Sequence, residues 1–328
     1  MEVTMKKKIC QYLSEVLVEM LEEELLKLVE IPPEDKMGDY AIPCFAMAKK
    51  MHRNPMQIAS ELVEKLNEQK STLGIEKAEN VRKHWKLGEK PIDNLVYIVE
   101  SHGLVVTDFD TNTGDVDAYS HKISCDGTET YLIGYSKNKN AAARIHFDLA
   151  HELGHILLHD WNEDLSDISK EEFKELENQA NDFAASFLMP ENEFKADIGN
   201  YANKLPYYVE LKKRWKVSIA AMIRRSYSLG LIGNDEYQRM MRNMQKQGIR
   251  KVEPLDDILV TARPSLLKQA VGILLNQNVF TPREFMDELS SEYGLTLNAE
   301  DLEKLLGLSK GTLMGTLTLP QMKVILKK

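Results

Sequence analysis

The stretch RIHFDLAHELGHILLHDW, residues 144–161, contains His-Glu-Leu-Gly-His at positions 151–155. An α-helix advances about 100° per residue, so His151 and His155 would share one face, one turn apart. Apolar residues recur around them at helical spacing, at Ile145, Leu149, Ile156 and Leu158. The pattern predicts a largely buried helix that aims two imidazoles in the same direction.

Two imidazoles on one face can bind one Zn²⁺, and a glutamate directly after the first can take a proton from the attacking water. That glutamate is Glu152. Chance alone produces His-Glu-x-x-His in about one protein of this length in a hundred, so the motif by itself is moderate evidence for a zinc site. A catalytic zinc site also needs a third protein ligand. His159 would lie about 12 Å along the helix axis from His151. We therefore interpret His159 as a polar helix end.

The segment ELENQANDFAASFLMP, residues 175–190, offers a better third ligand. Its apolar residues recur at helical spacing, and it ends at a proline, as helices often do. Glu177 lies beside Ala180 and Ala184, small residues that would let this helix approach the first one closely. Asn181, one turn later, is predicted to hydrogen-bond a ligand histidine and fix its tautomer.

These two segments together resemble the ImmA/IrrE family of metallopeptidases, whose pattern leads from Arg-x-x-Phe into HELGH and then to Glu-x-x-Ala-Asn-x-Phe-Ala and Leu-Met-Pro. Flanking helices resemble the same family, over most of residues 74–254. The resemblance implies a mainly helical α+β fold, zincin-like, with a small sheet. It also implies His151, His155 and Glu177 as zinc ligands, Glu152 as general base, and a helix-turn-helix repressor of a mobile element, phage or stress response as substrate.

One alternative comes from a different functional class, a zinc-stabilised protein that sequesters its partner without cutting it. Glu152 argues against this alternative, because a purely structural zinc site needs no general base and usually fills its fourth position with protein.

Two short segments rich in Val, Ile, Tyr and Thr, VDAYSHKI and TETYLIGY, are separated by CDGTE with its Asp-Gly turn signal, and they predict a β-hairpin. Its second strand, residues 130–136, is predicted to be an edge strand that pairs with the substrate backbone. The alternative is an ordinary strand inside the sheet.

The N-terminal residues 5–67, with the core IPPEDKMGDYAIPCFAMAKKMHRNPMQIASELVEKL, resemble the appended N-terminal domain of bacterial arginyl-tRNA synthetases. The rest of the chain has no HIGH-type or KMSKS-type motif, so aminoacylation is not expected. The resemblance implies contact with tRNA. In a functional interpretation, a basic end formed by Lys49, Lys50, His52 and Arg53 contacts tRNA or mimics the synthetase to capture one of its partners, and a further hypothesis is that tRNA gates the peptidase. The alternative is a stabilising or interaction module.

The polar segment EQKSTLG, residues 68–74, is expected to interrupt the helical pattern and to mark a domain boundary. We therefore expect a synthetase-like module at 1–70, a peptidase domain at 74–254 and a helical extension at 255–328, where Thr281 and Asn298 are predicted N-caps. Near residues 211–231 a basic face is expected to meet a protein substrate, and contact with DNA is the alternative. Its members are Lys213, Arg214, Lys216, Arg224 and Arg225. The net charge of −9 gives no general case for nucleic-acid binding. Three scattered cysteines and no apolar run of membrane length predict a cytoplasmic protein without membrane contact.

Overall fold

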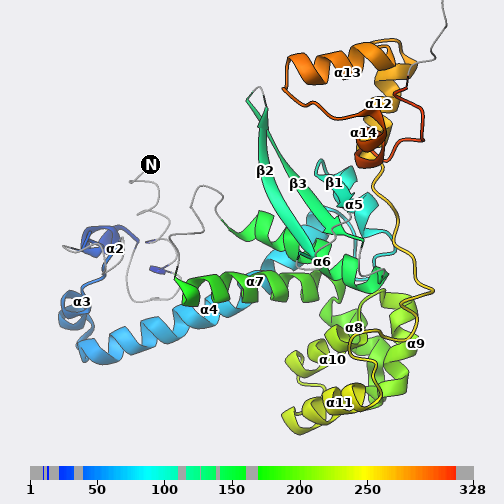
Figure 1. The fold of residues 1–328 in the computed structure, drawn as a ribbon. Helices are drawn as coiled ribbons and strands as arrows, with labels where there is room; N and C mark the ends of the chain where they lie inside the picture. Colours follow the sequence, from blue (N-terminus) through cyan, green and yellow to red (C-terminus); the bar gives the residue numbers. More distant parts are fainter. Residues whose placement is uncertain are drawn as a thin grey trace, which may run out of the picture. The chain divides into compact units, whose positions relative to one another are not determined.

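The computed structural model describes residues 10, 13–14, 22–32, 40–109, 116–125, 127–137, 141–159 and 169–314. The chain divides into two compact units, Met1–Leu73 and Gly74–Lys328. Within the described residues the elements are mainly helical with one small sheet, which confirms the predicted fold class (Figure 1). No described helix is both long enough and apolar enough to cross a membrane.

The first unit contains α2 (Glu22–Leu28), α3 (Cys44–Met51) and the beginning of α4 (Pro55–His84), with one antiparallel bridge between Glu30 and Ala41. Helix α4 begins at the Asn-Pro sequence, where the Asn54 side chain accepts a hydrogen bond from the Met56 amide at 2.9 Å. The Gly38 and Asp39 positions of the synthetase-like motif lie outside the described residues. A separate buried apolar cluster forms its core, with Leu25, Val29, Met47, Ile58 and Leu62 among its members.

Helix α4 continues through residues 69–74, which corrects our expectation that the polar segment EQKSTLG interrupts the helix. Glu, Gln and Lys are good helix formers, so polarity alone does not stop one. Gly74 has a packing role instead. A Cβ atom there would lie 2.3 Å from the carbonyl oxygen of Gln179 in α7, so only glycine permits this close approach.

The sheet of the second unit has the strand order β1-β3-β2. Strand β2 (Ala118–Cys125) pairs with β3 (Thr128–Ser136) in antiparallel register, with Ala118 opposite Tyr135, and this confirms the predicted hairpin. Asp126 of the turn lies outside the described residues. Strand β1 (Val105–Phe109), which follows α5 (Leu95–Ser101), pairs with the other side of β3 in parallel.

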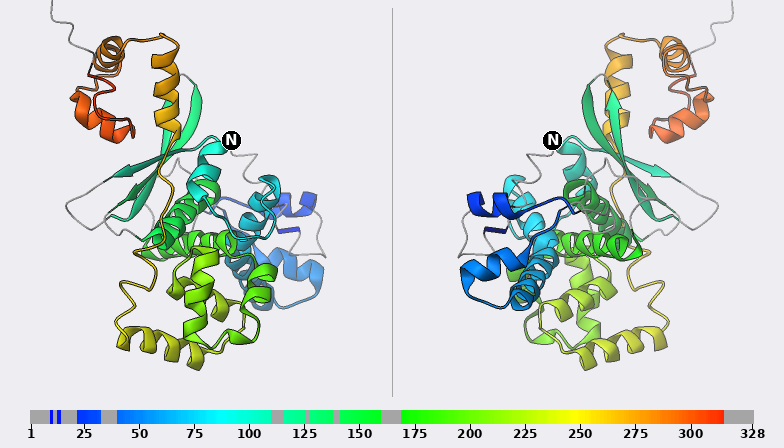
Figure 2. Two further views of the ribbon diagram at one scale, coloured as in Figure 1. Left: turned by 90° about the vertical axis from the view of Figure 1, so that its right-hand side faces the viewer. Right: turned by 90° about the vertical axis from the view of Figure 1, so that its left-hand side faces the viewer.

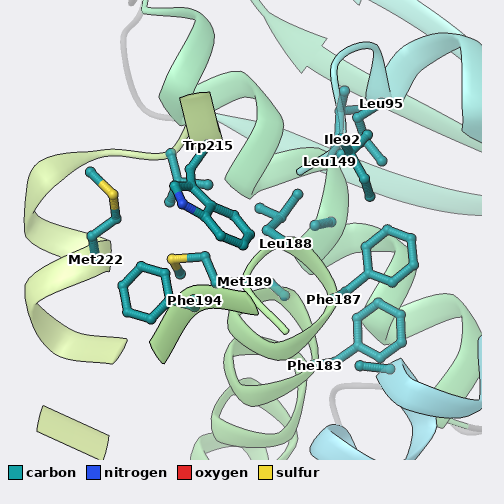
Figure 3. Close-up of a cluster of buried hydrophobic side chains, with 14 of the residues drawn as sticks. Ile92, Leu95, Leu149, Phe183, Phe187, Leu188, Met189, Phe194, Trp215 and Met222 are labelled. Carbon is teal, nitrogen blue, oxygen red and sulfur yellow. The ribbon is translucent and has the colours of Figure 1, made fainter. Parts of the chain in front are cut away.

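Helices α6 (Ala142–Leu158) and α7 (Lys170–Leu188) pack against each other beside this sheet (Figure 1). Helix α7 begins at a capping box formed by Ser169 and Glu172 and ends just before Pro190, as predicted. Phe183 and Phe187 on α7 stack with ring centroids 5.4 Å apart. Figure 3 shows their rings side by side, with Leu149 and Leu95 on the neighbouring elements of the same core.

Three helices follow α8 (Glu191–Ile198) and the short helix η2 (Gly199–Tyr201). They are α9 (Leu205–Trp215), α10 (Ile219–Ser228) and α11 (Asn234–Lys246) (Figure 2). Lys212 of α9 is fully buried and pairs with Glu253 at 2.8 Å and Asp256 at 2.6 Å. Glu253 also accepts the Ile219 amide, so one buried carboxylate fixes the start of α10.

The C-terminal extension contains α12 (Leu266–Asn276), α13 (Pro282–Ser291) and α14 (Ala299–Leu305) around a small apolar cluster. Thr281 and Asn298 cap α13 and α14 as predicted. Glu100 of α5 is buried and accepts hydrogen bonds from the Ser265 and Leu266 amides at the start of α12. The boundary at residue 254 stays a prediction.

Candidate metal centre

Small residues bring the two site helices together. A Cβ atom on Gly154 of α6 would lie 3.2 Å from the Cα atom of Ala180 in α7, and Ala180 and Ala184 are fully buried. The two backbones therefore approach more closely than larger side chains would allow. Glu177 extends from α7 toward the two histidines of α6 as a result.

The three expected ligands lie at metal-binding distances from one another. The Nε2 atoms of His151 and His155 are 2.9 Å apart, and the Glu177 carboxylate oxygens lie 3.4 and 3.2 Å from them. Zinc bonds of about 2.0–2.1 Å in a tetrahedron place neighbouring ligand atoms about 3.3 Å apart. Among the described residues, these three form the group whose ligand atoms could hold one ion. The donor set therefore fits Zn²⁺.

His155 is held in the neutral form that a metal ligand needs. Burial, with smaller contributions from the nearby His151 and His159 rings, lowers the pKa of His155 to about 3. At neutral pH the ring therefore carries no charge and has a lone pair to offer.

Glu152 is positioned by a side chain that sequence reasoning missed. The Ser120 hydroxyl on β2 donates a hydrogen bond to Glu152 Oε2 at 2.5 Å. Burial raises the pKa of Glu152 above its usual value, while this hydrogen bond and His151 act in the opposite direction. A carboxylate with raised proton affinity suits a general base. No local motif marks Ser120, because the hairpin brings it to the site from 32 residues away.

The hydrogen bond at the second ring nitrogen of a ligand histidine involves a different residue than we expected. Asn181 donates to the backbone carbonyl of Glu177 at 2.7 Å and makes no hydrogen bond to His151 or His155. Instead, His159 Nδ1 lies 2.9 Å from His155 Nδ1. With His155 Nε2 facing a metal, the Nδ1 proton is donated to His159, which fixes the tautomers of both rings. The four-residue spacing that pairs His151 with His155 also pairs His155 with His159.

A cavity of about 310 Å³ opens on the site. Glu152, Asn181 and two of the expected ligands line it, together with Asp117 and Ala118 at the start of β2; the two ligands are His151 and Glu177. Strand β3 is paired on both sides, so the prediction that residues 130–136 form an edge strand is wrong. The parallel strand β1 occupies that edge, and parallel pairing leaves no local sequence signal. The edge beside the cavity belongs to β2.

The predicted basic face divides into two parts. Lys213 pairs with Glu210, Arg214 with Glu193 and Asp197, and Lys216 with Asp93. Arg224 and Arg225 line a different cavity, which also contacts α6 and α7.

Comparison with known families agrees with both resemblances. Residues 99–227, which contain the candidate metal centre, match the model of the IrrE N-terminal-like domain, a peptidase M78 family. Residues 4–83 match the model of the arginyl tRNA synthetase N terminal domain. Each match covers less than half of the chain, so one segment is similar to a peptidase family and another is similar to a synthetase domain.

Several arginine–tRNA ligases are similar to the N-terminal region of this chain. Arginine–tRNA ligase of Clostridium perfringens is 53% identical over 47 residues, which are 14% of this chain and 8% of the ligase. The ligase of Pediococcus pentosaceus is 48% identical over 64 residues, 19% of this chain and 11% of the ligase. The ligase of Clostridium acetobutylicum is 41% identical over 76 residues, which are 23% of this chain and 13% of the ligase. The chain therefore spans only a small part of these relatives.

Proposed function

We propose that this chain is a zinc-dependent endopeptidase that cleaves a specific regulatory protein. The observation that carries the proposal is a cavity that Glu152 lines together with His151 and Glu177. These two residues and His155 form a group with metal-ligand spacing. The match of residues 99–227 to a peptidase family supports it.

Zn²⁺ held by His151, His155 and Glu177 would act as a Lewis acid that polarises the scissile carbonyl and lowers the pKa of water, so that the water loses a proton more easily. Glu152 takes the proton of the attacking water and passes it to the leaving nitrogen. Ser120 holds the Glu152 carboxylate by its hydrogen bond. Burial of Glu152 favours its protonated form and so helps it accept the proton.

The outer edge of β2 is the proposed support for the substrate backbone. Among the described strands, β2 pairs with β3 alone, so its other edge can offer main-chain hydrogen bonds to an extended peptide. Ala118, at the start of this strand, lines the same cavity as Glu152. Pairing along β2 would therefore place a peptide bond near the metal ligands.

The proposed substrate is a helix-turn-helix repressor in the cytoplasm, and one cut would inactivate it and switch on its genes. The resemblance to ImmA/IrrE peptidases supports this substrate class. The test incubates zinc-loaded protein with helix-turn-helix repressors encoded beside its gene and maps fragments by mass spectrometry. Glu152→Gln should keep zinc and lose cleavage, whereas Glu171→Gln, an exposed control on α7, should cleave normally.

An active Glu152→Gln protein would remove Glu152 from the mechanism. Bound zinc with no cleavage, combined with stable co-purification of a repressor by wild type and variant, would favour the alternative of a non-proteolytic binding protein.

Contact between the N-terminal module and tRNA is a separate proposal with weaker support. Two of its expected basic residues already pair with acidic side chains inside the module, Lys50 with Glu24 and Arg53 with Glu61. Such pairing reduces the positive charge available to phosphate groups, so any tRNA affinity should be low and sensitive to salt.

A further inference from the structure

A second cavity adjoins the candidate metal centre. It has a volume of about 360 Å³ and lies among α6, α7, α10 and α11. Phe147, Asp148 and Asn181 line both this cavity and the one that contains Glu152. A peptide bound across the metal centre can therefore extend into the second cavity.

Four arginines line this second cavity, and we call them the arginine cluster: Arg144, Arg224, Arg225 and Arg250. Asp148 and Asp182 are the two carboxylates in its lining. A neighbouring hollow of about 410 Å³ shares Arg144 and Arg250, adds Lys251, and has no carboxylate in its described lining. This concentration of positive charge stands out in a chain with a net charge of −9.

The arginine cluster leaves most of its hydrogen-bond donors to a ligand. Within the described ranges, none of its members forms an ion pair with a carboxylate within 4.0 Å, unlike Lys213, Arg214 and Lys216 on the neighbouring helix. Arg225 is only 5% exposed, and its one hydrogen bond to a described residue runs from Nε to the Met189 carbonyl at 3.2 Å. Arg225 is the buried member of the cluster, and Asp182 and Glu191 act on its charge without forming an ion pair with it. Two carboxylates in the lining do not balance four guanidinium groups, so the cavity favours an anionic ligand.

The distance between the arginine cluster and the metal ligands suits a peptide that is cut at the metal centre and places one of its side chains in the second cavity. Arg144 precedes His151 by seven residues on α6, about 10 Å along the helix axis. An extended peptide covers this length with about three residues. We propose that the arginine cluster binds an acidic side chain, Asp or Glu, two to four residues from the scissile bond on one side only. This inference rests on the proposed peptidase function.

Cleavage of a peptide library tests the inference. The zinc-loaded full chain is incubated with peptides derived from a bacterial proteome, and residue frequencies around each cut are read by mass spectrometry. Asp and Glu should be enriched at one position by roughly tenfold, the size expected of a hydrogen bond to a charged group. No acidic preference at any position would overturn the inference.

Charge reversal identifies the residues responsible. The Arg224→Glu/Arg250→Glu double variant changes two exposed members of the cluster and should replace the acidic preference with a preference for Lys and Arg. The matched control is Arg239→Glu/Arg242→Glu, which changes two exposed arginines of α11 that do not line the cavity. It should keep the acidic preference. An unchanged preference in the cluster variant would overturn the inference.

A binding measurement separates failure of this inference from failure of the peptidase proposal. Fluorescein-labelled alanine–serine peptides with two central aspartates, asparagines or lysines are titrated with Glu152→Gln protein and followed by anisotropy. Preference for the aspartate peptide, lost in the cluster variant, would support the inference even if the wild type cut nothing. Equal or absent binding of all three would overturn it.

A nucleic-acid ligand is the competing outcome. A labelled DNA duplex of about 20 base pairs is titrated in the same way at several salt concentrations. Tight DNA binding that depends on Arg224 and Arg250, without any preference among the peptides, would assign the arginine cluster to phosphate groups and overturn the acidic-peptide inference.

Discussion

At the scale of single residues, the histidine series on α6 organises the candidate site. His151 and His155 offer Nε2 atoms to one metal position, and His159 contacts the opposite nitrogen of His155. The sequence predicts the first two by their spacing, together with Glu152 and Glu177. Distance along the helix excludes His159 as a third ligand, but this argument does not address its contact with the Nδ1 atom of His155.

Loss of His159 should weaken zinc binding without unfolding the protein. His159→Ala removes the acceptor for the His155 Nδ1 proton, and removal of such outer contacts typically costs about 10- to 100-fold in metal affinity. Competition with a chromophoric zinc chelator measures the change. His159→Asn, which restores an acceptor near the Nδ1 position, should recover part of the affinity. Equal affinity in all three proteins would contradict the proposed contact.

His146 should make stability depend on pH. It is 1% exposed, and burial lowers its pKa to about 4 from the usual 6.5. The unfolded chain therefore binds the proton more tightly, so stability falls as the pH drops from about 6.5 toward 4. His146→Leu should reduce this loss by an amount on the order of 3 kcal/mol.

Urea unfolding in EDTA measures the pH dependence, because metal loss in acid then contributes nothing. Tryptophan fluorescence reports on the second unit, since all three tryptophans belong to it. Parallel pH profiles for wild type and His146→Leu would show that another group dominates.

At the scale of elements, local periodicity predicted the two site helices and the hairpin but not their non-local partners. Apolar spacing and Pro190 define α7, and the Asp-Gly signal defines the β2–β3 turn. The place of β1 beside β3 depends on a parallel pairing of distant segments, so residues 130–136 were wrongly placed at an edge. The continuity of α4 contradicts the break expected at the polar segment EQKSTLG, because Glu, Gln and Lys favour helices and packing against α7 requires Gly74.

Gly74→Ala should destabilise the second unit even though alanine favours helices by about 1 kcal/mol. The new Cβ atom would meet the backbone at Gln179, and overpacking of this kind costs about 1–3 kcal/mol. Urea unfolding followed by circular dichroism measures the change. Gly272→Ala in α12 is the matched control, because a Cβ atom there meets nothing within 4 Å, and it should be stabilising. Stabilisation by both substitutions would contradict the close approach.

At the scale of the whole molecule, one chain carries a segment similar to a peptidase family and a segment similar to a synthetase domain. Sequence motifs point to both similarities, because each has a distinctive local pattern. No sequence motif indicates whether the N-terminal module regulates the candidate metal centre. An experiment must therefore ask whether tRNA changes the rate of proteolysis.

We expect arginine tRNA to leave the cleavage rate unchanged at about 0.1 M salt, because ion pairs inside the module already engage Lys50 and Arg53. Repressor cleavage by the full chain with and without tRNA measures this. A tRNA-dependent rate that disappears in Lys49→Glu/Lys50→Glu would instead make the module a tRNA sensor.

The most direct test of the central claim is anomalous diffraction at the zinc edge from crystals of the zinc-loaded full chain. The account predicts one zinc ion bound by His151, His155 and Glu177 at about 2.0–2.2 Å, with no fourth protein ligand and Glu152 beside the open position. Absence of zinc from these three residues, or a fourth position filled by protein, would contradict a catalytic metal centre.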